Sequence, residues 1–77
     1  MDRPIDLRRS DRRVLREMRR RAENDVAAVS QRDLSAATGY CPRTVQAALL
    51  RMRDAGVVRV ARYGRPISYH LPPEMGE

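Results

Sequence analysis

The spacing of hydrophobic residues predicts a helix in the third quarter of the chain, and flanking residues predict its ends. Pro42 is acceptable at the first position of a helix, where its missing N–H has no partner to lose. Gly56 can close the far end, because glycine readily adopts a positive φ angle. Apolar side chains at positions i, i+3, i+4 and i+7 form one stripe between them: Val45, Ala48, Leu49 and Met52. We therefore expect a helix over residues 42–55 with this stripe facing a core.

A second helix is predicted immediately before it. Ser30 is followed three residues later by Asp33, which is the spacing of a capping box, in which the serine hydroxyl accepts a hydrogen bond from a backbone N–H. The segment from Gln31 to Thr38 is therefore expected to be helical, and Gly39 is suited to end it. A turn of about four residues then leads into the next helix, which is a helix-turn-helix arrangement.

The N-terminal part of the chain predicts a further amphipathic helix. Ser10 can cap its start, and Asp11 lies favourably near the positive end of the helix dipole. The apolar stripe of this helix contains Val14, Leu15, Met18 and Ala22. The opposite face contains Arg12, Arg13, Arg16, Arg19 and Arg20. We interpret this basic face either as a solvated surface or as a surface near a DNA backbone or a partner.

After Gly56 the hydrophobic pattern changes from a helical to an alternating period, which is typical of strands. One side of the alternating segment contains Val58, Val60, Ile67, Tyr69 and Leu71. The other side contains Arg59, Ser68 and His70. Residues 62–66 separate the two runs and predict the loop of a β-hairpin. Residues 26–29 are expected to form a short additional strand.

Together these elements predict an α+β protein with three helices and a small antiparallel β-hairpin. The chain has 77 residues, which is enough for one domain, and we assign residues 10–71 to it. Residues 1–9 are expected to be a flexible N-terminal arm, which either frays or reaches DNA or a second subunit. Residues 72–77 are expected to be a disordered tail.

The charge of the chain favours a polyanionic partner. Its net charge is +6, and all sixteen basic residues are arginine. The planar guanidinium group forms two parallel hydrogen bonds with a phosphate or a guanine, which an ammonium group cannot do. A GC-rich genome is the favoured explanation for the absence of lysine, whatever the arginines do.

The composition disfavours several other classes of protein. One cysteine, Cys41, cannot form an internal disulfide, and one histidine, His70, with scattered carboxylates provides no nucleophile–base pair and no metal-ligand set. We therefore expect neither enzyme activity nor a cofactor. No apolar run approaches the ~20 residues of a membrane span, and the N-terminus lacks a signal-peptide core. A cytoplasmic protein with no membrane partner is expected.

Two segments resemble the winged helix-turn-helix domain of bacterial transcription regulators of the MarR and GntR types. The segment that begins at Ser30, SQRDLSAATGYCPRTVQAALLRMRDAGVV, is similar to their helix-turn-helix, and RYGRPISYHL is similar to their wing and third strand. The resemblance covers residues 10–71 and implies a winged helix-turn-helix fold that binds double-stranded DNA. The chain departs from the pattern at Cys41, where these families usually have serine or threonine, and no effector domain is expected.

The resemblance also implies how the DNA is read. In helix-turn-helix proteins the second helix of the motif enters the major groove, and its N-terminal residues contact base edges. With the apolar stripe inward, the outward residues of the 42–55 helix are Arg43, Gln46, Ala47 and Leu50, flanked by Thr44 and Arg51. Arg51 is expected to be among the residues that contact DNA. Arg43 is expected to contact guanine, Gln46 adenine and Ala47 a thymine methyl group, with phosphate contact or solvent exposure as the alternative for each. Thr44 is expected to contact a phosphate.

Further contacts with the DNA backbone are expected in two other places. The first is a helix N-terminus, which favours a bound phosphate and which contains Ser30, Gln31 and Arg32. The second is the wing, where Arg62 and Arg65 can enter a narrow minor groove that concentrates negative potential. Tyr63 is expected either to lie along the sugar-phosphate backbone or to cover the hairpin.

The sequence therefore predicts a sequence-specific protein for double-stranded DNA, acting as a transcriptional regulator, with no small-molecule ligand. A homodimer or a DNA-assembled oligomer is expected, with the first helix and the Ile5–Leu7 segment as the dimer surface. Two alternatives remain open. One is a DNA-organising, replication or recombination accessory factor of a plasmid, phage or integrative element. The other is a winged-helix module that binds protein, a hypothesis supported by the outward apolar side chain of Leu50.

Overall fold

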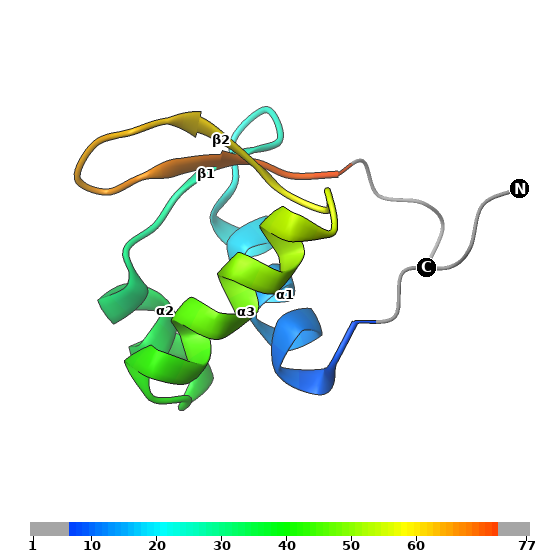
Figure 1. Cartoon of the computed structure of the whole chain (residues 1–77). Helices are drawn as coiled ribbons and strands as arrows, with labels where there is room; N and C mark the ends of the chain where they lie inside the picture. Colours follow the sequence, from blue (N-terminus) through cyan, green and yellow to red (C-terminus); the bar gives the residue numbers. More distant parts are fainter. Residues whose placement is uncertain (1–6, 73–77) are drawn as a thin grey trace, which may run out of the picture.

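The structure, a computed structural model, describes residues 7–72, which form three helices and a three-stranded antiparallel sheet. The elements in chain order are α1 (Arg9–Arg21), β1 (Val26–Ala28), α2 (Gln31–Thr38), α3 (Pro42–Asp54), β2 (Arg59–Arg62) and β3 (Ser68–His70). The sheet covers one side of the helices, and the β2–β3 turn extends above α2 (Figure 1). The predicted α+β class is confirmed.

The hydrophobic core lies between the helices and the sheet. The helices contribute Val14, Met18, Leu34, Val45, Ala48, Leu49 and Met52. The sheet and its flanking segments contribute Ala27, Val29, Val57, Val58, Tyr69 and Leu71. The apolar stripe predicted for α3 is therefore confirmed as buried over its whole length.

The ends of α2 follow the predicted local signals. Ser30 Oγ accepts a hydrogen bond from the Asp33 backbone N–H at 3.0 Å, and Gly39 ends the helix with a φ angle of +83°. Ser35 Oγ then donates to the carbonyl oxygen of Tyr40 at 2.5 Å. These bonds hold the turn that connects α2 to α3, and the predicted bounds of α2 are confirmed.

The C-terminal end of α3 has the hydrogen-bond pattern of a Schellman motif. Gly56 has a φ angle of +78°, and its N–H donates to the carbonyl oxygen of Arg53 at 3.0 Å. The N–H of Val57 donates to the carbonyl oxygen of Met52 at 2.8 Å, which is the bond of this motif that spans more residues along the chain. Val57 and Met52 are both buried, so the chain turns from α3 directly into the core side of the sheet.

The start of α1 differs from the prediction. The N-cap residue is Arg8, and Ser10 lies inside the helix. The carboxylate of Asp11 accepts a hydrogen bond from the Arg8 backbone N–H at 3.2 Å, so an acidic side chain satisfies the helix end in place of the serine hydroxyl. Leu7 packs against the core. Residues 1–6 of the predicted arm and residues 73–77 of the predicted tail lie outside the described residues.

The sheet is assembled around β3, which pairs antiparallel with both other strands in the order β1-β3-β2. The register places Tyr69 opposite Ala27 on one side and opposite Val60 on the other. Between the Val60 and Arg62 pairs the register of β2 shifts by one residue, which leaves Ala61 as a bulge. The segment between the two strands covers residues 63–67, one residue later than the predicted loop.

Candidate nucleic-acid interface

The outward side of α3 presents the polar residues that the sequence pattern selected. Arg43 and Gln46 are exposed and Ala47 is half-buried. Leu50 completes this outward row with 42% of its surface exposed. Because the opposite side of α3 is buried in the core, the row is held in one orientation and is accessible to a partner.

The N-terminus of α3 begins at Cys41, an exposed residue whose side chain makes no capping hydrogen bond to the helix. Its Sγ lies 3.3 Å from Thr44 Oγ1. This hydrogen bond with the Thr44 side chain is the main cause that lowers the pKa of the Cys41 thiol. Thr44 itself is half-buried.

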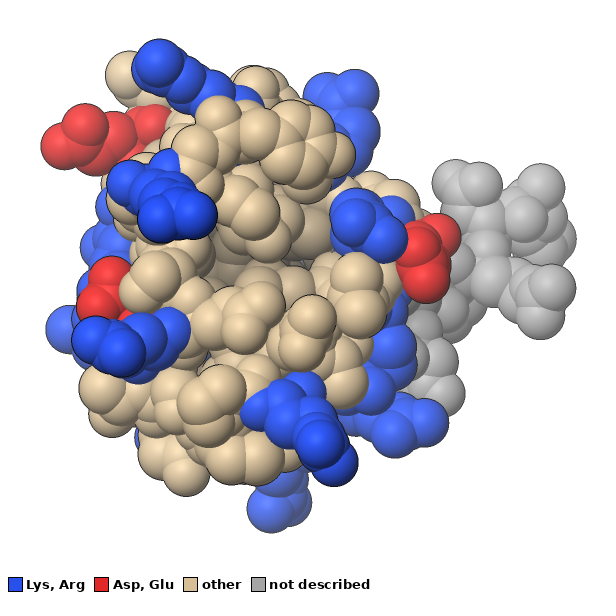
Figure 2. All heavy atoms as spheres, turned by 60° about the vertical axis from the view of Figure 1, so that its left-hand side comes forward, with Lys and Arg blue, Asp and Glu red and all other residues tan. Residues whose placement is uncertain are grey.

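A hollow of about 560 Å³ separates the start of α2 from the β2–β3 turn. One wall contains Ser30, Gln31 and Asp33, and the other contains Gly64, Arg65 and Pro66. The floor is apolar and contains Val29, Leu49, Ile67 and Tyr69. Figure 2 shows this side of the molecule, hollowed between uncharged side chains with basic side chains around it. The fold thus brings together the two segments for which backbone contacts are predicted.

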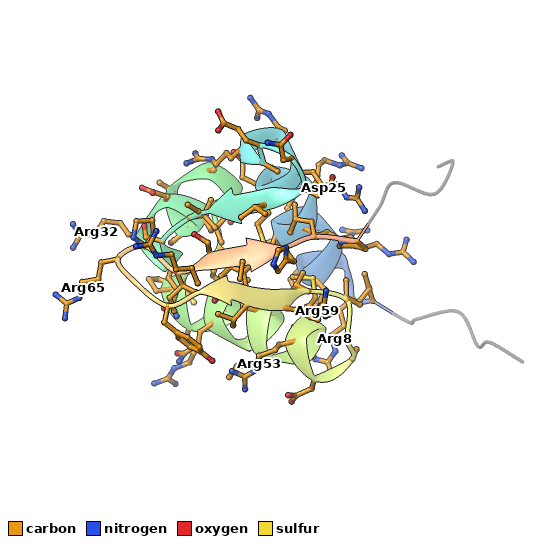
Figure 3. All side chains as sticks on the ribbon, turned by 90° about the horizontal axis from the view of Figure 1, so that it is seen from above. Arg8, Asp25, Arg32, Arg53, Arg59 and Arg65 are labelled. Atoms are coloured by element: carbon orange, nitrogen blue, oxygen red, sulfur yellow. The ribbon has the colours of Figure 1, made fainter. Side chains whose placement is uncertain are left out.

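Arg32 and Arg65 project from the same side of the molecule, one from α2 and the other from the β2–β3 turn (Figure 3). Both are exposed, as is Arg62. Tyr63 is 76% exposed at the same turn, so it does not cover the hairpin, which was one of its two predicted roles. Arg32 and Arg65 therefore place two cationic groups on one side of the molecule, from the start of α2 and from the turn.

Arg51 lies apart from these residues, because its guanidinium group turns toward α1. Its Nη2 lies 2.7 Å from Asp11 Oδ1, and its Nε lies 3.2 Å from both carboxylate oxygens. Nη2 also lies 3.4 Å from Ser10 Oγ. Asp11 is only 1% exposed, and its side-chain hydrogen bond raises the pKa of Arg51. The structure therefore places Arg51 in the α1–α3 contact and not with the outward row.

The pair between Asp11 and Arg51 was not anticipated from the sequence, although a signal for it exists. Asp11 precedes Val14, Leu15 and Met18 by three, four and seven residues, so it extends the apolar stripe of α1. An acidic side chain in a buried stripe requires a cation or several hydrogen-bond donors. The identity of the cation comes only from the packing of α1 on α3.

Comparisons with known proteins give no assignment: no protein-family model matches the chain, and no curated protein sequence matches it. Crossing a lipid bilayer requires a longer and more apolar helix than any that residues 7–72 form. The candidate site is therefore defined by geometry alone. It comprises the start of α2 and the β2–β3 turn, which lie on either side of the hollow, and the outward row of α3, whose buried neighbour Leu49 lines the same hollow.

Proposed function

We propose that the protein is a winged helix-turn-helix protein that binds double-stranded DNA in a sequence-specific manner. The observation that carries the proposal is the exposure of Arg43 and Gln46 on a helix whose opposite side is fully buried. The major groove of B-DNA admits an α-helix, and helix-turn-helix proteins present the N-terminal residues of such a helix to base edges. In this proposal α3 is the recognition helix and the β2–β3 turn is the wing.

The side chains of the recognition helix have distinct roles in this proposal. Arg43 donates two hydrogen bonds to O6 and N7 of a guanine, and Gln46 pairs with N6 and N7 of an adenine. Ala47 contacts the methyl group of a thymine. Leu50 extends this apolar contact along the groove. The combination favours a site with both a G·C and an A·T pair close together.

The remaining contacts orient the protein on the duplex. The start of α2 presents Ser30, Gln31 and Arg32 to a phosphate, and Thr44 contacts another. The wing presents Arg62, Tyr63 and Arg65 to the backbone or to a minor groove. Arg51 has no DNA contact in this proposal, because its guanidinium group is already bonded to Asp11.

A transcriptional regulator is the biological role that this binding mode favours. A homodimer on a palindromic site would place two recognition helices about one helical turn apart. The alternative is a DNA-organising or recombination accessory factor. A footprint separates the two roles, because a single palindrome supports the regulator, whereas tandem direct repeats or an extended footprint support the accessory factor.

Selection of bound sequences from a random pool of duplexes tests the proposal, and we expect one enriched motif. Arg43→Ala and Gln46→Ala should each weaken binding to that motif by about 1–3 kcal/mol, roughly 5- to 150-fold, with little change on unrelated duplexes. Arg53→Ala is the matched control, because Arg53 is an exposed arginine at the other end of the same helix. A pool without an enriched motif would contradict sequence-specific reading.

A further inference from the structure

The densest positive charge lies on α1, away from the residues assigned to DNA reading. Seven of the thirteen residues of α1 are arginine, and its only acidic residues are Asp11 and Glu17. Asp11 is bonded to Arg51. Glu17 lies 3.4 Å from Arg20 and 2.9 Å from Arg21. Neither carboxylate of α1 therefore forms an ion pair with the arginines at the N-terminal end of this helix.

Four arginines at the N-terminal end of α1 form an outward row without an acidic partner among residues 7–72: Arg9, Arg12, Arg13 and Arg16. They stand at i, i+3, i+4 and i+7, so they share one helix face about 10 Å long. All four are exposed. Together with Leu7 they line an open hollow of about 610 Å³. This set is called the α1 row below.

The α1 row and the outward row of α3 face different sides of the molecule. Helix α1 packs against α3 and buries Val14 and Met18 in the core, and the ion pair between Asp11 and Arg51 crosses the α1–α3 contact. Each exposed row lies on the side of its helix that points away from the contact. A duplex seated on α3 therefore leaves the α1 row available for a different partner.

The composition of the α1 row matches the backbone of a nucleic acid better than a protein. B-DNA carries one negative charge per about 1.7 Å of helix axis, so a row of this length faces several phosphates. Protein–protein interfaces have an apolar, aromatic-rich core, whereas among residues 7–72 Leu7 is the only apolar residue that lines this hollow. A second copy of the same row is a poor partner, because like charges repel.

We propose that the α1 row binds the phosphate backbone of a second DNA duplex, so that one molecule bridges two duplexes. This inference rests on the proposed function, which supplies the first duplex at α3. The contact at α1 is independent of sequence, because arginine–phosphate bonds carry no base information. Bridging brings two distant DNA segments together, which is the activity of a DNA-organising factor.

The test immobilises a duplex with the preferred motif and measures capture of a second, fluorescent duplex of unrelated sequence by the full chain. The variant Arg9→Gln/Arg13→Gln/Arg16→Gln keeps good helix formers at all three positions. We expect it to bind the immobilised duplex within a factor of about three of the wild type, since non-contacting charges act only through the long-range field. Capture of the second duplex should fall at least about tenfold, given the large share of phosphate contacts in affinity.

Two controls make the outcomes distinct. Arg43→Ala/Gln46→Ala should abolish preference for the immobilised motif, and circular dichroism with thermal unfolding should show that both variants fold as the wild type does. Capture that persists in the arginine-to-glutamine variant would overturn the inference, because the duplexes would then be joined through paired recognition helices. Wild-type protein that binds the beads without capturing a second duplex would overturn it as well, while the proposed function would stand.

Two further results would assign the α1 row differently. If poly-glutamate bound the row at low salt while duplex capture never occurred, the partner would be an acidic protein and the bridging inference would fail. If the wild type bound no duplex on the beads at all, the proposed function itself would fail, and the bridging inference with it. Loss of all DNA binding in the arginine-to-glutamine variant would make α1 the primary DNA site and overturn both proposals.

Discussion

The guanidinium group of Arg51 and the carboxylate of Asp11 form a bidentate ion pair between α3 and α1, with the shortest contact of 2.7 Å from Nη2 to Oδ1. The Asp11 side chain is 2% exposed, whereas that of Arg51 is 35% exposed. The same carboxylate accepts the backbone N–H of Arg8. One buried acidic side chain thus caps α1 and fixes the helix that we assign to DNA reading.

Removal of either partner of this pair should lower stability. Asp11→Asn should reduce the free energy of unfolding by about 2 kcal/mol, because hydrogen bonds to charged groups are among the stronger ones. Arg51→Ala should cost about 3 kcal/mol, since it leaves a buried carboxylate without its cation. Urea denaturation measures both, with Arg53→Ala as the exposed control. An Arg51→Ala protein of unchanged stability but weakened specific DNA binding would return Arg51 to the DNA interface.

Position 56 requires glycine because of its backbone conformation, and not because a side chain would lack room there. Its φ angle is +78°, and a Cβ atom added there would meet no atom within 4 Å. Gly56→Ala should therefore destabilise the protein by about 1 kcal/mol through backbone strain alone. Gly64→Ala is the matched control, because the added Cβ would lie 3.6 Å from the nearest atom at a φ angle outside the left-handed region. Equal thermal shifts for the two variants would contradict this explanation.

A better N-cap residue for α3 should stabilise the protein. Cys41 occupies the N-cap position with an extended backbone and no capping side-chain hydrogen bond. Serine is a strongly preferred N-cap residue, so Cys41→Ser should raise the free energy of unfolding by about 0.5–1 kcal/mol. Cys41→Ala has no side-chain acceptor and should give no such gain. Denaturant midpoints of the two variants, compared with the wild type, provide the measurement.

The reactivity of Cys41 should depend on pH in a predictable direction. The hydrogen bond with Thr44 lowers the pKa of the thiol, so the thiolate forms at lower pH in the folded protein than in the unfolded chain. Its contribution to stability is therefore present above the unfolded pKa and is lost as the pH falls through the folded pKa. The rate of iodoacetamide alkylation, followed by mass spectrometry, should reach its midpoint at lower pH when the protein is folded.

Substitution of Thr44 tests the cause of this shift. Thr44→Val removes the hydroxyl at nearly constant shape and should move the alkylation midpoint of Cys41 to higher pH. Ser35→Ala is the control, because that hydroxyl bonds the Tyr40 carbonyl instead. An alkylation profile of Thr44→Val identical to that of the wild type would exclude the threonine side chain as the main cause.

The β2–β3 turn should contribute to DNA affinity without contributing to sequence specificity. Arg62→Ala and Arg65→Ala should each weaken binding to every duplex alike, and each should reduce the slope of log K against log salt by about 1. Titrations at several salt concentrations, on the selected motif and on an unrelated duplex, give both quantities. Loss confined to the selected motif would show that the turn reads bases.

Signals confined to a few neighbouring residues were sufficient to predict the helices that form the candidate site. The cap at Ser30 and the glycines at positions 39 and 56 define helix ends through local backbone chemistry, so the bounds of α2 and the end of α3 could be read along the chain. The apolar period of α3 likewise determined that Arg43 and Gln46 face outward, because a buried stripe leaves one exposed side.

Relationships between distant residues could not be read in this way. The start of α1 was predicted wrongly at Ser10, because the side chain of Asp11 performs the capping while it also binds Arg51, forty residues away. The pairing of β1 with β3, the hollow between α2 and the β2–β3 turn, and the separate direction of the α1 row likewise depend on which surfaces meet in the core. Which surfaces meet is determined by the packing of all elements together, and it cannot be deduced from any short segment.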